Sequence, residues 1–278
     1  MSEPPPTVAT VMTRARQLGV DRLDAQLLLA RALARPRSWL LAHDDALLGA
    51  LQWLALQAEL LRRAGGEPLA YIVGEQEFHG LCLQVNSDVL VPRPDTEVLV
   101  DWALEMLNGA VPGPAPRKVV DLGTGSGAVA LAVKHGCPGA TVTATDASAA
   151  ALQVAKANAL RLGLAIETLT GSWWEPVAGR RFDLVLSNPP YIAGSDAHLA
   201  ALRFEPTLAL TPGGDGLDAL RTLTHGAVAH LELGGWLLLE HGFDQHEAVQ
   251  SMLRDQGFAC VQTRIDLGGQ PRCTGGCR

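Results

Sequence analysis

Residues 187 to 192, SNPPYI, place several chemically useful groups directly after an apolar run. The preceding residues 181 to 186, RFDLVL, predict a buried β-strand. Two prolines then end the strand, because neither can donate a backbone hydrogen bond, and the first holds Asn188 in an extended conformation. An amide side chain, two carbonyl groups and a tyrosine are therefore held stiffly at a strand end. Such an array favours a ligand that offers hydrogen-bond donors.

A glycine-rich turn at residues 121 to 127, DLGTGSG, is the second candidate for chemistry. Glycines at such a turn let the backbone approach a ligand closely. Gly123, Gly125 and Gly127 have G-x-G-x-G spacing, whereas the dinucleotide fingerprint needs its last glycine one place later. The compact form, preceded by an acidic residue, suits a nucleoside that carries an amino acid better than one that carries a pyrophosphate. A purely structural glycine turn is the alternative.

Asp146 ends the next predicted strand, 19 residues after Gly127. In a doubly wound sheet this position places a carboxylate beside the glycine turn, where it can accept hydrogen bonds from both hydroxyls of a ribose. We favour that role over the alternative, in which Asp146 or Ser148 caps the following helix. Trp173 and Trp174 follow the third strand, and we expect one to cover an adenine face while the other packs inside.

The elements that must position these residues alternate between strand and helix beyond residue 116. This alternation predicts an α/β fold with a doubly wound, mostly parallel sheet. A seventh strand is assigned to residues 271–278, although their composition is poor for a strand. The other six strands are expected within residues 118–127, 140–148, 165–171, 182–190, 234–242 and 258–267.

We divide the chain of 278 residues into three regions. Residues 1–73 carry helical periodicity and predict a small helical bundle, with 8 basic and 7 acidic residues. Residues 74–92 change to a period of two and predict a β-hairpin, with a turn signal at residues 86–88, NSD. Residues 93–278 form the α/β domain, whose first helix is expected to be capped by Asp95 or Thr96.

Together these features resemble the class I S-adenosylmethionine-dependent methyltransferases. The Asn-Pro-Pro-Tyr sequence narrows the resemblance to enzymes that methylate a planar nitrogen, namely adenine N6, cytosine N4 or glutamine N5. Such a nitrogen is a poor nucleophile because its lone pair is conjugated. The resemblance implies that Asn188 Oδ1 and the Pro189 carbonyl accept the two N–H groups of the substrate. It also implies that the Tyr191 ring packs on the flat face of the substrate.

The rest of the chain most resembles the release factor glutamine methyltransferases. The similarity runs from Leu69 to Arg272 and is carried, in order, by GEPLAYIVGEQEFHGL, VLVPRPDTE, EPTLALTPGGDGLDALR, LLLEHGFDQ and IDLGGQPR. It implies methyl transfer from S-adenosyl-L-methionine to the N5 side-chain amide of the glutamine in the Gly-Gly-Gln motif of peptide-chain release factors. Residues 1–73 are then predicted to recognise the substrate. The chain departs from the family pattern at Ser172 and at Gln270-Pro271.

The resemblance also implies the residues of each site. A catalytic role falls to Asn188, Pro189 and Tyr191, and the substrate glutamine is bound by these three together with Pro190. The implied cofactor-binding residues are Gly123, Thr124, Gly125, Ser126, Gly127, Asp146, Trp173 and Asn188.

Composition limits the other functions. A net charge of −7 disfavours an adenine N6 methyltransferase acting on DNA or RNA, which shares the same motif and remains the alternative. A regulator that only binds S-adenosylmethionine is a third possibility, but it would not need the Asn-Pro-Pro-Tyr sequence. Five cysteines, no secretory segment and no apolar run of membrane length predict a reduced cytoplasmic protein.

The expected partners are peptide-chain release factors. We expect the protein to be a monomer that binds no nucleic acid stably, no membrane and no metal. The tripeptide Gly-Gly-Gln at residues 268–270 of the chain itself is interpreted as a coincidence. His241 is expected to form local hydrogen bonds rather than to act as a base. For Arg93, structural ion pairing and shaping of the substrate channel are equally favoured.

Overall fold

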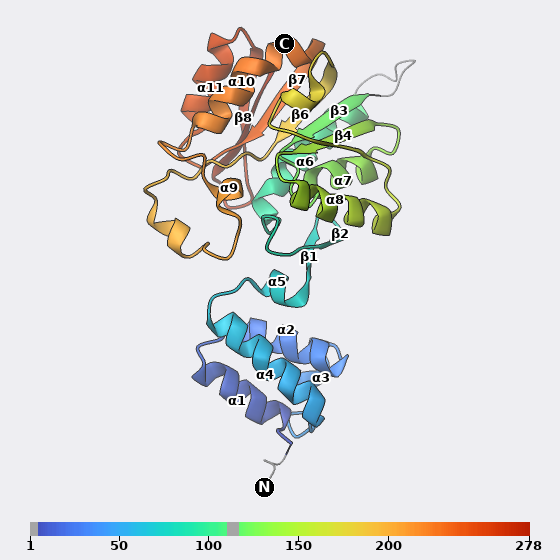
Figure 1. Cartoon of the computed structure of the whole chain (residues 1–278), viewed down its shortest axis with the longest axis vertical. Helices are drawn as coiled ribbons and strands as arrows, with labels where there is room; N and C mark the ends of the chain where they lie inside the picture. The colour runs from blue at the N-terminus through green and yellow to red at the C-terminus, as the bar shows by residue number, and fades with distance from the viewer. Residues whose placement is uncertain (1–4, 110–116) are drawn as a thin grey trace. The chain divides into compact units, whose positions relative to one another are not determined.

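The structure is a computed structural model that describes residues 5–109 and 117–278. It divides into two compact units, Met1–Gly74 and Glu75–Arg278, which we call the helical unit and the catalytic unit. Figure 1 labels most of the helices and strands of both. In the described part of the chain, no helix combines the length and the hydropathy that a membrane span requires.

The helical unit has the helical fold that the periodicity predicted. Asp21 caps α2, because its carboxylate accepts the Leu23 N–H at 2.7 Å. The apolar faces of the helices meet in one core, in which Val11, Leu28 and Leu56 are fully buried. The helices are α1 (Val8–Gln17), α2 (Arg22–Leu33), α3 (Arg37–Leu40), α4 (Ala50–Ala64) and α5 (Leu69–Val73).

A β-hairpin opens the catalytic unit, formed by β1 (Glu75–Phe78) and β2 (Leu81–Gln84). Its turn lies at His79 and Gly80, whose φ angles are 49° and 78°. Two consecutive positive φ angles match the right-handed twist of the strands, so this turn closes the hairpin. The turn signal at residues 86–88 instead marks a second turn after β2.

The central sheet has seven strands in the order β5-β4-β3-β6-β7-β9-β8. Strands β3 to β7 are parallel, whereas β9 pairs antiparallel with both β7 and β8. The strands are β3 (Lys118–Leu122), β4 (Thr141–Asp146), β5 (Glu167–Thr170), β6 (Phe182–Ser187), β7 (Leu231–Glu240), β8 (Ala259–Ile265) and β9 (Pro271–Cys277).

Helices cover both faces of this sheet (Figure 1). One face packs against α6 (Glu97–Gly109), α7 (Ala128–Gly136) and α8 (Ala149–Leu162). The other face packs against α10 (Asp218–His230) and α11 (His246–Asp255). A doubly covered, mostly parallel sheet confirms the predicted fold class. The shorter helical elements are η1 (Pro94–Thr96), η2 (Glu175–Val177), η3 (Ala197–Ala200) and α9 (Thr207–Leu210).

The start of α6 differs from the prediction that Asp95 or Thr96 caps it. The 3-10 turn η1 precedes this helix, and no side-chain capping bond is formed there. Both side chains bind elsewhere: Asp95 pairs with Arg272 at 3.2 Å, and the Thr96 hydroxyl accepts a hydrogen bond from the Asn188 side chain. The predicted caps therefore connect α6 to the end of the sheet.

Candidate active site

A cavity of about 790 Å³ lies in the catalytic unit at the carboxyl ends of the central parallel strands. Strand β3 is followed in sequence by β4 on one side, whereas β6 lies on its other side. Such a switch point is where open α/β sheets bind ligands. The cavity is lined by residues from the glycine turn, by Asp146 and Trp173, and by Asn188 and Pro190. Two motifs that lie far apart in the sequence therefore meet in one site.

The glycine turn between β3 and α7 forms one wall of the cavity. Gly123, Thr124, Gly125 and Ser126 line it. Gly127 does not, and a Cβ atom there would lie 3.0 Å from Leu131 and 3.2 Å from Ala155. Gly127 therefore serves close helix packing, which was not its predicted role.

Asp121 supports the glycine turn from within the sheet. Its carboxylate accepts the Thr124 hydroxyl at 2.6 Å and the Ala130 N–H at 3.2 Å. Burial raises the pKa of Asp121 to about 7, and the two hydrogen bonds oppose that shift. From the sequence, Asp121 was recognised only as an acidic side chain before the turn, with no role of its own.

Asp146 occupies the position expected for a ribose-binding carboxylate. One oxygen accepts the Gly125 N–H at 2.9 Å and the other accepts the Ser148 N–H at 2.8 Å. The side chain that caps α8 is Ser148, which accepts the Ala151 N–H at 3.1 Å. Burial raises the pKa of Asp146, so its charge lies in a partly desolvated place at the cavity. The capping role therefore belongs to Ser148.

The two adjacent tryptophans have different environments, as expected. Trp173 lines the cavity and adopts a positive φ of 46°. Trp174 turns away and stacks on His230, with ring centroids 4.6 Å apart, and its Nε1–H donates to the Thr222 carbonyl at 3.2 Å. Trp173 is thus the tryptophan available to a ligand.

The Asn-Pro-Pro-Tyr segment follows β6 and contributes Asn188 and Pro190 to the cavity. The Asn188 Nδ2 group donates to Thr96 Oγ1 at 3.1 Å. Tyr191 lies outside the cavity lining and donates its hydroxyl to Glu240 at 3.2 Å. Pro189 is buried and is also absent from the lining. The structure thus brings Asn188 and Pro190 to the cavity but leaves two predicted substrate residues behind it.

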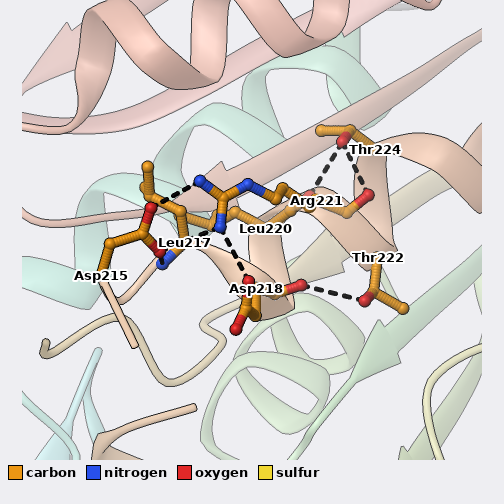
Figure 2. A network of polar contacts seen from close by, with 7 residues as sticks. All are labelled: Asp215, Leu217, Asp218, Leu220, Arg221, Thr222 and Thr224. Carbon is orange, nitrogen blue, oxygen red and sulfur yellow. Dashed lines mark hydrogen bonds and ion pairs between the residues drawn. The ribbon is translucent and has the colours of Figure 1, made fainter. Parts of the chain in front are cut away.

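A charged network borders the cavity at the start of α10 (Figure 2). Arg221 donates to Asp215 at 2.5 and 2.9 Å and to Asp218 at 2.7 Å. The Arg221 guanidinium lowers the pKa of Asp215 to about 2. Asp218 and Thr222 line the cavity, so this network holds one wall of the cavity in place. From the sequence, this segment was known only as one that resembles the family.

A second ion pair also borders the cavity. Arg93 lines the cavity and pairs with Glu205, whose carboxylate also accepts the Val91 N–H at 3.1 Å. Glu205 is buried, so this pair anchors the segment that leads to the lining residues 206–209, 211 and 212. Arg93 therefore has both roles that the sequence left open, ion pairing and shaping of the cavity.

Two other sequence features have structural roles. His241 is buried between the Gly242 carbonyl and the Thr274 hydroxyl, at 2.8 and 2.7 Å, and burial lowers its pKa to about 4. The loop at 268–270 is exposed, and Asp266 holds the backbone of Gln270 through hydrogen bonds in both directions. Among the described residues, no group of histidine, cysteine or carboxylate side chains could hold a metal ion.

Comparison with known proteins identifies the family. The family described as Methyltransferase small domain matches residues 97–250, and the PrmC N-terminal domain matches residues 9–74. The release factor glutamine methyltransferase of Bordetella pertussis is 50% identical over 261 residues, covering 93% of this chain and 95% of that protein. The chain belongs to the release factor glutamine methyltransferase family. The relative from Coxiella burnetii is 43% identical over 252 residues, covering 90% of each chain.

Solved structures place the fold of this release factor glutamine methyltransferase family member among the methyltransferases. A methyltransferase from Pyrococcus furiosus aligns with a TM-score of 0.53 at 18% identity, covering 80% of this chain and 96% of that one. The 16S rRNA N2 G1207 methyltransferase of T. thermophilus, solved with AdoMet and guanosine, aligns with a TM-score of 0.54 at 19% identity. It covers 73% of this chain and 49% of that one, and at this identity the likeness concerns the fold.

Proposed function

We propose that this protein transfers a methyl group from S-adenosyl-L-methionine to the N5 side-chain amide of the glutamine in the Gly-Gly-Gln motif of peptide-chain release factors. The observation that carries the proposal is the Asn188 amide at the cavity. One of its two Nδ2 protons is donated to Thr96, and an amide that binds Thr96 through its nitrogen directs Oδ1 away from Thr96, where it can accept a substrate N–H. Membership in the family supports release factors as the substrate.

The residues present suit S-adenosylmethionine as the cofactor. Both oxygens of Asp146 accept backbone N–H groups and retain lone pairs for the ribose hydroxyls. Gly123 has no side chain, and a Cβ atom there would meet the Trp173 ring at 3.5 Å, so the indole lies close against the glycine turn at the cavity. When bound, the cofactor would supply an electrophilic methyl group. Asp146, Trp173 and the glycine turn would hold and orient it.

The substrate amide nitrogen needs orientation more than it needs a base. Its lone pair is conjugated with the carbonyl, so attack requires that the N–H groups be held and the lone pair be directed toward the methyl group. Asn188 Oδ1 is an acceptor that borders the cavity, and it also stabilises positive charge that develops on nitrogen. The Pro189 carbonyl is the proposed second acceptor. Tyr191 keeps its proposed catalytic role, although it lies outside the cavity lining.

The reduced state of the cysteines supports a cytoplasmic location, where the proposed release factor partners act. All five cysteines are free in the structure. Proteins of oxidising compartments commonly pair their thiols, whereas cytosolic proteins keep them reduced. We infer that the protein acts there as a monomer, without stable binding to nucleic acid.

A methyl-labelled cofactor tests the proposal directly. The full-length protein is incubated with labelled S-adenosylmethionine and, in separate reactions, with a release factor, the same factor with its motif glutamine changed to asparagine, DNA and RNA. We expect label only in the unchanged factor. Label in a nucleic acid, or equal label in both release factors, would favour the alternative substrate class or a different acceptor residue.

A further inference from the structure

Glu240 is a buried carboxylate close to the site but outside the cavity lining. It ends β7 and is 1% exposed. Its Oε1 accepts the Tyr191 hydroxyl at 3.2 Å, and the Thr96 hydroxyl lies close enough to this carboxylate to lower its pKa. Among the described residues, Oε2 has no hydrogen-bond partner. Burial of a carboxylate is costly, so a group kept in this place calls for an explanation.

Thr96 connects this carboxylate to the candidate catalytic amide. Its hydroxyl is buried and accepts the Asn188 Nδ2–H at 3.1 Å. A hydroxyl has one proton to donate. If that proton points toward Glu240, the lone pairs of Thr96 face Asn188, and only the N–H end of the amide can bind there.

We propose that Glu240 is a positioning residue, which through Thr96 fixes the orientation of the Asn188 amide so that Oδ1 faces the substrate. The inference rests on the proposed function. An ionised carboxylate can only accept hydrogen bonds, and this fixes the direction of each bond along the chain from Glu240 to Asn188. With the opposite direction, Asn188 would present N–H groups to a substrate that also offers N–H groups.

The direction of the chain depends on the charge of Glu240. Burial raises its pKa to about 7, while the hydrogen bonds from Thr96 and Tyr191 and the charge of Arg272 act against that shift, and Asp95 adds to it. The thiol of Cys273, which pairs with Glu240 across β7 and β9, is a further titratable group near it. A protonated Glu240 could donate to Thr96 and let that hydroxyl donate to Asn188 Oδ1. We therefore expect turnover to fall as the pH drops through about 7.

The first experiment compares the full-length protein with Glu240→Gln, Thr96→Val and Thr96→Ser, using an intact release factor. Glu240→Gln and Thr96→Val should each lower kcat about tenfold, because a misdirected amide loses orientation of the reacting nitrogen. Thr96→Ser keeps the hydroxyl and should retain most activity. The dissociation constant of S-adenosylmethionine should stay unchanged in all three. The double variant Glu240→Gln/Thr96→Val should be no slower than either single variant, since both act on one chain.

A pH profile and a spectroscopic measurement separate this role from a structural one. Glu240→Gln should lose the fall in kcat below about pH 7 that the wild type shows, whereas Tyr191→Phe should keep it. The Asn188 side-chain N–H resonances, assigned through Asn188→Asp, should shift through the same pH in the wild type and not in Glu240→Gln. This second measurement needs no substrate, so it also holds if release factors are not methylated, the result that would count against the proposed function. Unchanged kcat in Glu240→Gln, additive losses in the double variant, or Asn188 resonances that ignore Glu240 would overturn the inference.

Discussion

The helical and catalytic units bury different kinds of side chain. In the described part of the helical unit, Gln26 is the one buried polar residue, and the core is otherwise apolar. The catalytic unit buries carboxylates, hydroxyls and amides, many of them where its parallel strands end, among them Asp121, Thr145, Ser187 and Glu240. Buried polar groups destabilise a fold unless they are hydrogen-bonded. Their concentration at the ends of the parallel strands therefore indicates that function, rather than the stability of the fold, determines the residue types there.

The surfaces of the two units differ in the opposite direction. The smaller helical unit exposes more large apolar side chains for its length than the catalytic unit does: Leu23, Leu27, Leu41, Leu47, Leu51, Leu54 and Leu61. Leu51, Leu54 and Leu61 follow one another at helical spacing along α4. Exposed apolar surface is typical of binding faces. We therefore propose that chemistry resides in one unit and recognition of the release factor in the other.

Removal of the Asn188 amide should produce the largest effect and tests the chemical half of this comparison. Asn188→Ala should lower methyl transfer about 100-fold or more, because one preorganised polar contact at the reacting centre is lost. Cofactor affinity should stay close to the wild-type value. Kinetics together with calorimetric titration of S-adenosylmethionine measure both quantities.

Gln26→Ala is the matched control in the helical unit. It removes a buried amide that hydrogen-bonds Arg37 at 3.0 Å and that has no role in the cavity. It should lower the melting temperature and leave kcat unchanged. If Asn188→Ala bound the cofactor and still turned over within a few-fold of the wild type, Asn188 would not be the acceptor.

Loss of the Asp146 carboxylate should have the next largest effect. Asp146→Ala should weaken cofactor binding by ~1.5–3 kcal/mol, because two ribose hydroxyls lose a charged acceptor. Asp21→Ala in the helical unit is a close match, since Asp21 also accepts the N–H of the residue two places ahead, at 2.7 Å against 2.8 Å for Asp146.

The matched pair separates binding from helix capping. Asp21→Ala should cost about 1 kcal/mol of stability, as the loss of a helix cap does, and leave cofactor affinity unchanged. Thermal unfolding and cofactor titration are measured on both variants. A fall in stability for Asp146→Ala with an unchanged cofactor dissociation constant would reduce its role to a local backbone contact.

The sequence predicted those parts of the site that lie within one short segment. The glycine turn and the Asn-Pro-Pro-Tyr segment contain the spacing and rigidity that define them, and Asp146 follows the turn at a fixed distance along one strand and helix. Thr96 and Glu240 gave no such signal, because each contacts a partner far away in the sequence: Thr96 accepts a hydrogen bond from Asn188, and Glu240 accepts one from Tyr191. The Asp95 or Thr96 cap was predicted from local propensity, and tertiary contacts took precedence over it.

Strand β9 illustrates the same limit within the fold. Its glycines are poor strand formers, yet a Cβ atom at Gly275 would lie 2.4 Å from the Leu238 side chain and 3.0 Å from Trp102. The glycine is required because β9 inserts between β7 and β8 beneath a tryptophan. Propensity describes the isolated strand, whereas the requirement comes from neighbours more than thirty residues away.

The exposed leucines of α4 provide the smallest and most selective test. The double variant Leu51→Gln/Leu54→Gln changes two side chains that are 83% and 66% exposed, so the core of the helical unit should be unaffected. If this face contacts the body of the release factor, kcat/KM for the intact factor should fall about tenfold, the loss expected when apolar contacts at an interface are removed. A short Gly-Gly-Gln peptide cannot reach that face, so its slower methylation should not change.

Leu160→Gln is the matched control on the catalytic unit, because Leu160 is an equally exposed leucine (86%) on helix α8. It should leave kcat/KM for both substrates at the wild-type value. Equal losses for peptide and intact factor in the double variant would mean that the substitutions act on the catalytic unit rather than on recognition. No loss for either substrate would show that this face of α4 does not bind the factor, and the division of labour between the units would then need another recognition surface.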